Sequence, residues 1–266
     1  MLIIGELINA SRKPVARAIR EQDAAAIAGI AAMQHACGAG YIDVNAGVFA
    51  DTEADHLAWL VQTVQQATGA PCCVDSPSPG AIEAALAVHQ GTAMINSISL
   101  EEKRCNAILP VIAGTDLKVI ALCMSDDGMP ETVDQRMAIA DRLVNRLVGA
   151  NVPVNNIYVD PLVQPVATNS TYGTAFLNTI ETIMAQFPGI HTVCGLSNIS
   201  YGLPERKLLN QCFVVMAVLK GLDAAIINPT DKRMVAHIAA AEALAGRDNY
   251  CAGYLSAFRA GKLELS

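Results

Sequence analysis

The sequence predicts an α/β fold in which the whole chain, residues 1–266, forms a single (β/α)8 TIM barrel domain. Short apolar runs alternate with longer amphipathic stretches eight times along the chain. The repeat is about 33 residues long, which favours parallel strands joined by right-handed helical crossovers. The chain length suits eight such units closed into a barrel, and no linker-like or low-complexity tract divides it.

The expected strands are short and apolar on both faces, which is typical of strands covered on both sides by helices. In chain order they are 2–5, 41–44, 72–74, 93–96, 118–122, 157–159, 192–194 and 224–227. The expected helices are 14–37, 51–68, 79–89, 101–114, 132–149, 170–187, 205–220 and 231–246. Asp51, Ser78 and Thr132 are suitable helix N-caps, and Gln135 completes a capping box with Thr132. Glycines stand where several helices should end, at Gly38, Gly69, Gly91, Gly114 and Gly221.

Composition excludes several classes of partner. The net charge is −7 and the basic residues are scattered, so we expect no nucleic-acid surface. No apolar run approaches the roughly 18 residues that a membrane span requires, and the N-terminus lacks a signal-peptide pattern. We therefore expect a cytoplasmic protein without a membrane partner. The eight cysteines form no C-x-x-C pair and are expected to be reduced, mostly buried thiols.

Polar side chains stand at or near the C-terminal ends of the expected strands, where "YIDVNAG", "CCVDS", "AMINS", "YVDPL" and "TVCGLSN" each pass from apolar to polar residues. In a (β/α)8 barrel these strand ends meet at one mouth, which is where barrel enzymes keep their active sites. The residues expected to converge there are Asp43, Asn45, Asp75, Asn96, Asp160 and Asn198.

The chemistry of this set favours an organic ligand over a metal ion. Asn is as common in it as Asp, and none of the five histidines has metal-ligand spacing. Phosphate-binding glycine loops are absent as well. Carboxylates accept hydrogen bonds and amides both accept and donate them. Such a cup matches the edge of a 2-amino-4-oxo-pteridine, whose N3–H and 2-NH₂ can both donate to one carboxylate.

Several motifs recur in the order and spacing of a known family. They are "MLIIGELIN", "DVNAG", "VDS", "AMINS", "YVDPL", "GLSNIS", Arg206 and "GLDAAI". Together they resemble the methyltetrahydrofolate:corrinoid protein methyltransferases of the pterin-binding (dihydropteroate synthase-like) barrel superfamily. Family members usually open with G-E-R-x-N, whereas this chain has Leu7 in that pattern, and Tyr201 stands where an amide residue is common.

The resemblance implies roles for individual residues. Asp75, Asn96 and Asp160 would contact the pterin ring, and Asn198 would face N5 as the catalytic residue. The remaining implied substrate contacts are Ser197, Tyr201 and Arg206, and the implied supporting residues are Glu6, Asn9, Asp43 and Asn45.

The implied reaction moves a methyl group between N5 of tetrahydrofolate and the cobalt of a cobamide, with no metal bound by this chain. The D-x-H-x-x-G signature of corrinoid-binding domains is absent, so the cobamide would arrive on a separate corrinoid protein. Tetrahydrofolate or 5-methyltetrahydrofolate would be the small-molecule substrate. Relatives in acetogenic and O-demethylase systems run in opposite directions, and the sequence does not choose between them. We expect a homodimer, with 231–260 as a last helix and dimer contact.

Two alternatives stay open. A dihydropteroate synthase shares the barrel, but its N-V-T-P-D-S-F loop does not occur at "NASRKPV", and "GLSN" stands where that enzyme has a strand-end lysine. A folate-binding protein without turnover would bind tetrahydrofolate and show no methyl exchange.

Overall fold

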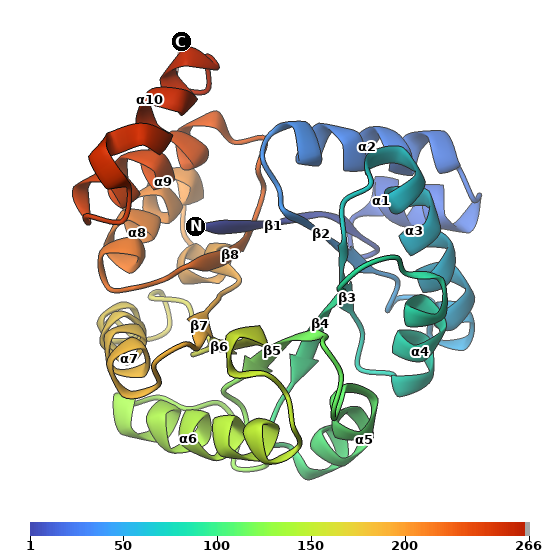
Figure 1. Ribbon diagram of the computed structural model, residues 1–266, viewed down its shortest axis with the longest axis horizontal. Coiled ribbons are helices and arrows are strands. Elements are labelled where there is room, and N and C mark those ends of the chain that lie inside the picture. The colour runs from blue at the N-terminus through green and yellow to red at the C-terminus, as the bar shows by residue number, and fades with distance from the viewer. Residues whose placement is uncertain (264–266) are drawn as a thin grey trace.

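The computed structural model describes residues 1–263 and shows eight parallel strands in a ring, with helices around the outside (Figure 1). The strands are β1 (Leu2–Asn9), β2 (Tyr41–Asn45), β3 (Cys72–Asp75), β4 (Met94–Ile98), β5 (Lys118–Leu122), β6 (Ile157–Asp160), β7 (His191–Thr192) and β8 (Ala224–Ile227). Their order in the sheet is β7-β6-β5-β4-β3-β2-β1-β8. The predicted (β/α)8 barrel is confirmed.

The helices follow the strands in the expected alternation. They are α1 (Lys13–Arg20), α2 (Ala24–Ala36), α3 (Glu53–Thr68), α4 (Pro79–Val88), α5 (Glu102–Ile112), α6 (Val133–Gly149), α7 (Tyr172–Gln186), α8 (Arg206–Leu219), α9 (Lys232–Leu244) and α10 (Ala252–Arg259). Ser78 caps α4, and Thr132 forms the expected capping box with Gln135 at α6. The structure contains no helix of 18 or more residues, within 1–263, that is apolar enough to cross a lipid bilayer.

Three expectations about helices were wrong. The single helix expected over 14–37 is two helices, because Gln22 adopts a left-handed conformation with φ 50° and Asp23 then caps α2 by accepting from the Ala26 amide at 3.0 Å. Asp51 lies within a short 3-10 helix and does not cap α3. The 231–260 stretch is not one helix, because α9 ends at Leu244 and α10 packs against it as a separate element.

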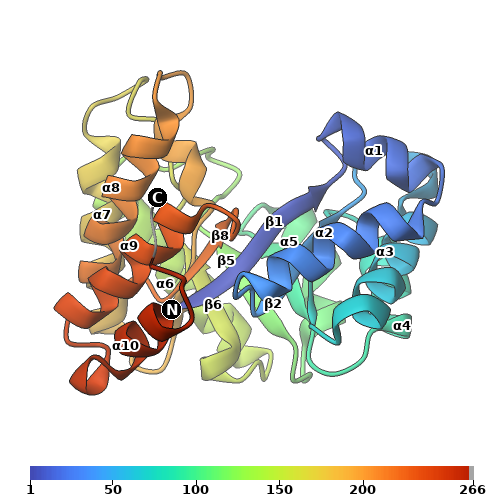
Figure 2. The same cartoon turned by 90° about the horizontal axis from the view of Figure 1, so that it is seen from above.

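One apolar layer fills the barrel interior, with one side chain from each strand or from its extension. Its members are Ile4, Tyr41, Cys73, Met94, Ile120, Tyr158, Val193 and Ala224. Because side chains alternate across a strand, the next inward positions lie two residues further on, toward the strand C-termini. The interior above this layer is therefore the barrel mouth. Figure 2 shows β1 rising from the N-terminus to α1 on that side.

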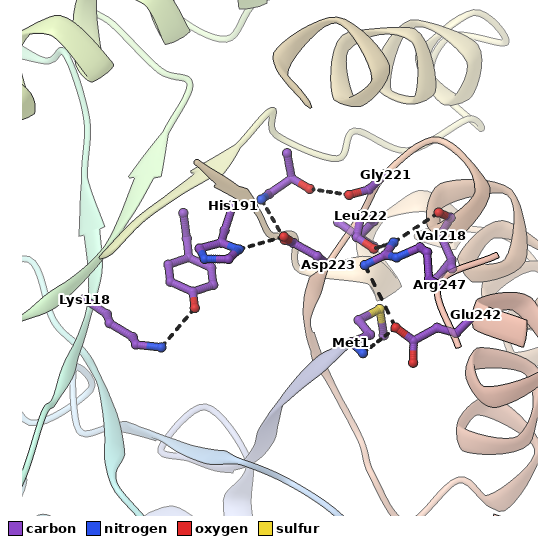
Figure 3. Close-up of polar contacts among 11 residues, drawn as sticks. Met1, Lys118, His191, Val218, Gly221, Leu222, Asp223, Glu242 and Arg247 are labelled. Carbon is purple, nitrogen blue, oxygen red and sulfur yellow. Dashed lines mark hydrogen bonds and ion pairs between the residues drawn. The ribbon is translucent and has the colours of Figure 1, made fainter. Parts of the chain in front are cut away.

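The barrel closes through a short seam between β7 and β8. Strand β7 has only two residues, and an isolated bridge pairs Gly195 with Ile226 above it. Below the bridge, the Asp223 carboxylate takes the place of ladder hydrogen bonds. It accepts from the Thr192 amide at 2.8 Å and contacts His191 Nδ1 at 2.7 Å (Figure 3).

Side chains at this closed end of the barrel, opposite the mouth, are paired. Lys118 Nζ donates to the Tyr158 hydroxyl at 3.0 Å, and the His191 ring stacks on the Tyr158 ring with centroids 4.6 Å apart. The amino group of Met1 pairs with Glu242, close to the Arg247 guanidinium (Figure 3).

The eight cysteines are free and differ in burial. Most are buried, as expected, and belong to strands or their packing helices: Cys72, Cys73, Cys105, Cys123 and Cys194. Cys37 is half-buried, whereas Cys212 on α8 and Cys251 before α10 are exposed.

Candidate active site at the barrel mouth

A polar layer lies directly above the apolar layer. Its side chains come from five strands at the positions two residues after the apolar ones: Glu6, Asp43, Asp75, Asn96 and Asp160. Asp43 and Asp160 are buried and the other three are half-buried. Four of the five are acids, so the mouth gathers carboxyl groups in a poorly hydrated space.

One pair in this layer joins β2 to β3. Asn45 Nδ2 donates to Asp75 Oδ2 at 3.0 Å, and the Gly47 amide donates to Asn45 Oδ1 at 3.1 Å. Burial raises the pKa of Asp75, while the Asn45 hydrogen bond and the Arg104 charge oppose that rise. Asn45 thus braces the loop after β2 and orients Asp75.

A second pair joins β4 to β2. Asn96 Nδ2 donates to Asp43 Oδ1 at 3.2 Å. Burial raises the pKa of Asp43 well above its ordinary value, and the nearby Asp75 charge adds to the rise. Because Asp43 and Asp75 are neighbours and both poorly hydrated, the layer favours holding a proton at Asp43.

Asp160 is the most isolated acid of the layer. Its Oδ1 accepts from the Leu162 amide at 2.8 Å, and the Gly195 amide also donates to this carboxylate. Burial nevertheless raises the pKa of Asp160 to about 7, since these two amides only partly replace lost hydration.

The segment after β7 forms one edge of the mouth. It is a 3-10 helix, η3 (Leu196–Ser200), in which Asn198 is exposed and lies close to Gly195. Arg206 holds the segment, because its Nη2 donates to the Ser197 carbonyl at 2.7 Å and its Nε donates to Ser200 Oγ at 3.1 Å. The Arg206 guanidinium lies 5.8 Å from the centre of the Tyr201 ring, which is 66% exposed.

The β1 residues separate into two roles. Glu6 lines the cavity at the mouth, and burial raises its pKa against the charges of Arg12 and Arg206. Asn9 accepts from the Ser11 amide at 2.9 Å and thereby shapes the turn into α1. Leu7 is buried, and its backbone amide donates to Gln34 Oε1 at 2.9 Å.

A cavity of about 260 Å³ lies beside the polar layer, on the β8 side of the mouth. Its walls are Glu6, Leu196, Ser197, Arg206, Lys207, Asn210, Ile227, Asn228, Asp231 and Met234. The structure therefore divides the expected site residues. Glu6, Ser197 and Arg206 line this cavity, while Asp75, Asn96, Asp160 and Asn198 do not.

Some residues of the mouth were missed by sequence reasoning. Arg104 reaches back from α5 and donates to the Ser97 carbonyl at 3.0 Å, next to Asn96. Lys207 and Asn210 line the cavity from α8. These lie on helices after the strand ends, and only their position within the first turns of α5 and α8 could have indicated them.

Within residues 1–263, no three His, Cys, Asp or Glu side chains are grouped so that they could hold a metal ion. The donors and acceptors of the polar layer instead pair with one another or with backbone amides.

Comparisons with known proteins agree with this architecture. A family profile described as pterin binding enzyme matches residues 5–228. The methylcorrinoid:tetrahydrofolate methyltransferase of Eubacterium limosum is 37% identical over 265 residues, which are 99% of this chain and 98% of that protein. The methionine synthase of Mycobacterium tuberculosis is 30% identical over 242 residues, 86% of this chain and 20% of that protein.

Solved structures show the same fold at low identity. A dihydropteroate synthase of Coxiella burnetii in complex with pteroic acid has a TM-score of 0.72 and 16% identity, covering 92% of this chain and 93% of that one. A Yersinia pestis dihydropteroate synthase has a TM-score of 0.68 and 15% identity over 91% and 93%. The family expected from the sequence motifs is thus confirmed, and the chain belongs to the pterin-binding enzymes.

Proposed function

We propose that this chain is a methyltransferase that moves a methyl group between N5 of tetrahydrofolate and the cobalt of a cobamide. The observation that carries the proposal is the 37% identity to the methylcorrinoid:tetrahydrofolate methyltransferase of Eubacterium limosum, which extends over nearly the full length of both chains. The name of that relative gives methylcorrinoid as the donor, and we propose the same direction here. An O-demethylase system is one source of such a donor.

The polar layer fits the edge of a pterin ring. Asp160 has one oxygen oriented by the Leu162 amide, and its carboxylate is the acceptor proposed for N3–H and 2-NH₂. Asp75 and Asn96 lie in register on adjacent strands, where they would pair with the ring heteroatoms. Asn45 and Asp43 hold Asp75 and Asn96 in place through the hydrogen bonds described above, and Glu6 is proposed to support the layer from β1.

Asn198 is the proposed catalytic residue. It is exposed at the mouth, close to Gly195, whose amide binds Asp160. A side-chain amide there can hydrogen-bond N5 and gain strength as N5 becomes positively charged, which is a preference for the transition state over the ground state. Holding the ring so that N5, the methyl group and cobalt are in line lowers the barrier by up to about 7–11 kcal/mol.

The cobamide is proposed to reach the mouth on a separate corrinoid protein. Three loops around the mouth carry exposed apolar side chains suited to such a contact: Val48, Met129 and Tyr201. A homodimer is also proposed, through the 231–260 stretch. Leu244 and Tyr250 in that stretch are 86% and 99% exposed, and both are large apolar residues.

The test is methyl transfer by the Asn198→Ala variant, with Asn178→Ala on the exposed surface of α7 as the matched control. Loss of one preorganised hydrogen bond should slow transfer by roughly 10²–10³-fold. Tetrahydrofolate affinity should change only modestly, because the N5 charge is absent in the ground state. Both directions should slow, since they share one transition state.

Two results would overturn the proposal. Tight tetrahydrofolate binding by the wild-type chain, with no methyl transfer from methylcobalamin or a methylated corrinoid protein, would indicate a binding protein. Formation of dihydropteroate from p-aminobenzoate and a dihydropterin pyrophosphate would indicate a synthase.

A further inference from the structure

One basic side chain of the fold is completely buried. Arg136, on the first turn of α6, has no exposed surface. A guanidinium keeps its charge inside a protein, and none of the four ion pairs found in residues 1–263 includes Arg136. Burying a charge without an opposite charge beside it destabilises a fold. Stability alone therefore does not account for this arginine.

The Arg136 guanidinium donates to uncharged oxygens of two segments. Its Nη1 donates to the Glu131 carbonyl at 2.8 Å, at the start of α6. Its Nε donates to the Pro161 carbonyl at 2.9 Å, and its Nη2 donates to Gln164 Oε1 at 2.7 Å, both in the loop after β6. Arg136 thus ties the loop after β6 to α6, and these contacts fix the orientation of its guanidinium.

The Pro161 contact reaches Asp160 through a single peptide group. The Pro161 carbonyl and the Leu162 amide belong to one planar unit, so their orientations are linked. Arg136 donates to that carbonyl, and the Leu162 amide donates to Asp160 Oδ1 at 2.8 Å. Hydrogen bonds in such a chain polarise and strengthen one another. Arg136 therefore strengthens the hydrogen bond that the Asp160 carboxylate receives.

The backbone at Leu162 is consistent with this arrangement. Leu162 has a φ of 66°, in the left-handed region that is uncommon for residues other than Gly, Asn and Asp. Such a conformation persists only where the surrounding contacts hold it. Here it directs the Leu162 amide back to Asp160, while Arg136 holds the carbonyl at the other end of the same peptide.

The titratable groups beside Asp160 are two thiols, Cys123 after β5 and Cys194 after β7. Burial raises the pKa of both, so neither is charged at neutral pH. The other acids of the polar layer stand on β1, β2 and β3, at least three strands away around the ring. The Tyr172 hydroxyl faces Arg136 from α7. Arg136 is thus a cation that lies one peptide group away from Asp160.

We propose that Arg136 is a positioning residue for substrate binding, which acts through the Pro161–Leu162 peptide to aim Asp160 at the ring and to keep it ionised. The inference rests on the proposed function, in which the Asp160 carboxylate accepts from N3–H and 2-NH₂. An ionised carboxylate can accept both hydrogen bonds, whereas a protonated one carries a donor that would face the ring donors.

The experiment measures tetrahydrofolate dissociation constants by calorimetry between about pH 5 and about pH 9. Arg136→Met removes the cation, and Gln164→Glu offsets it with a carboxylate. The matched controls on the exposed side of α6 are Arg142→Met and Gln135→Glu. Because the pKa of Asp160 is about 7, wild-type binding should weaken below that pH.

In Arg136→Met and Gln164→Glu, the pH below which binding weakens should rise by about one unit. Affinity at pH 7 should therefore fall about three- to sixfold and approach that of the wild type near pH 9. Both controls should match the wild type. Neither substitution should weaken binding further when Asp160→Asn is already present, because Asp160 is the group through which Arg136 acts.

Gln164→Glu distinguishes positioning from a purely structural role. The introduced carboxylate can pair with the Arg136 guanidinium, so urea unfolding should show at least wild-type stability while the pH profile of binding shifts. This variant decides the question alone if Arg136→Met does not fold.

An unchanged pH profile in Gln164→Glu would overturn the inference, as would a loss of affinity by the same factor at every pH. Further weakening by Arg136→Met in the presence of Asp160→Asn would also overturn it, since Arg136 would then act by another route. Failure of the wild type to bind tetrahydrofolate at any pH would instead refute the proposed function.

Discussion

The two ends of the barrel differ in the surroundings of their acidic side chains. At the mouth, Asp43, Asp75 and Asp160 are held in poorly hydrated surroundings, and burial raises the pKa of each. At the closed end, Asp223 pairs with His191, and the Met1 amino group pairs with Glu242. The acids of the mouth accept hydrogen bonds from amide groups, whereas those of the closed end face a basic group. A buried acid without a basic partner destabilises the fold. The comparison indicates that the mouth is organised to receive donors from a ligand and that the closed end is organised to hold the barrel shut.

The largest expected effect is at Asp160. Its carboxyl group holds a proton more tightly in the folded chain, where its pKa is about 7, than in the unfolded chain, where the ordinary value is 3.8. Stability is therefore lost as pH rises between these values and stays low above them. Asp160→Asn removes this loss, so relative to wild type its unfolding free energy should rise by about 3 kcal/mol between pH 5 and pH 8. Urea unfolding at pH 5 and pH 8 measures it.

The same substitution should weaken tetrahydrofolate binding by roughly 1–3 kcal/mol at pH 8, because an amide donor would then face the ring donors. Wild-type affinity should also fall as pH drops below about 7, since the proton must leave Asp160, and the variant should lack that dependence. Wild-type tetrahydrofolate affinity in Asp160→Asn would show that Asp160 does not bind the ring. Asp160 would then have a structural role, as the acids of the closed end do.

Asp223→Ala should have the opposite pattern. The buried Thr192 amide loses its acceptor and His191 its partner, so the unfolding free energy should fall by roughly 1–3 kcal/mol. Tetrahydrofolate affinity should not change. Glu181→Ala, which breaks the exposed pair with Lys220, is the control and should cost at most about 1 kcal/mol. Loss of folate affinity in Asp223→Ala would show that the two ends are coupled.

Arg104→Gln should produce a smaller change at the mouth. The Arg104 charge lowers the pKa of Asp75, whereas burial and the Glu53 charge raise it. Asp43 and Glu6 are the other titratable groups in this part of the polar layer. Without the Arg104 charge, Asp75 should take up a proton at higher pH. The pH below which tetrahydrofolate binding weakens should therefore rise, and the affinity at pH 7 should fall a few-fold. Arg104→Lys keeps the charge and should restore the limit. A pH profile unchanged in Arg104→Gln would restrict Arg104 to holding the Ser97 carbonyl.

The smallest effect is expected from metal chelation, which should not change activity. If the polar layer binds a ring rather than an ion, exhaustive treatment with a chelator should leave methyl transfer unchanged when the corrinoid donor is intact. Activity that disappears with chelator and returns with Mg²⁺ or Zn²⁺ would reverse this view of the mouth.

Features that depend on local sequence patterns could be predicted from the sequence, whereas features that depend on contacts between distant segments could not. Strand parity and the polar residues at strand ends are local patterns, so the barrel and the convergence of Asp75 with Asn45 followed from them. The break at Gln22 was not visible, because a left-handed residue other than Gly or Asn carries no sequence signal. Arg104 was missed because its contact with Ser97 depends on how α5 packs across β4.

The buried and the exposed cysteines should react with thiol reagents at very different rates. Alkylating reagents attack the thiolate, and burial raises the pKa of Cys72 to about 12 and that of Cys73 and Cys194 well above the ordinary value. Cys212 and Cys251 are open to solvent and should react at once. The buried thiols of β3 must wait until the strands separate, so their labelling rate reports how often the barrel opens. A ligand seated above Cys73 would lower that rate in proportion to its occupancy, which makes thiol labelling a measure of binding that requires no spectroscopic signal from the ligand.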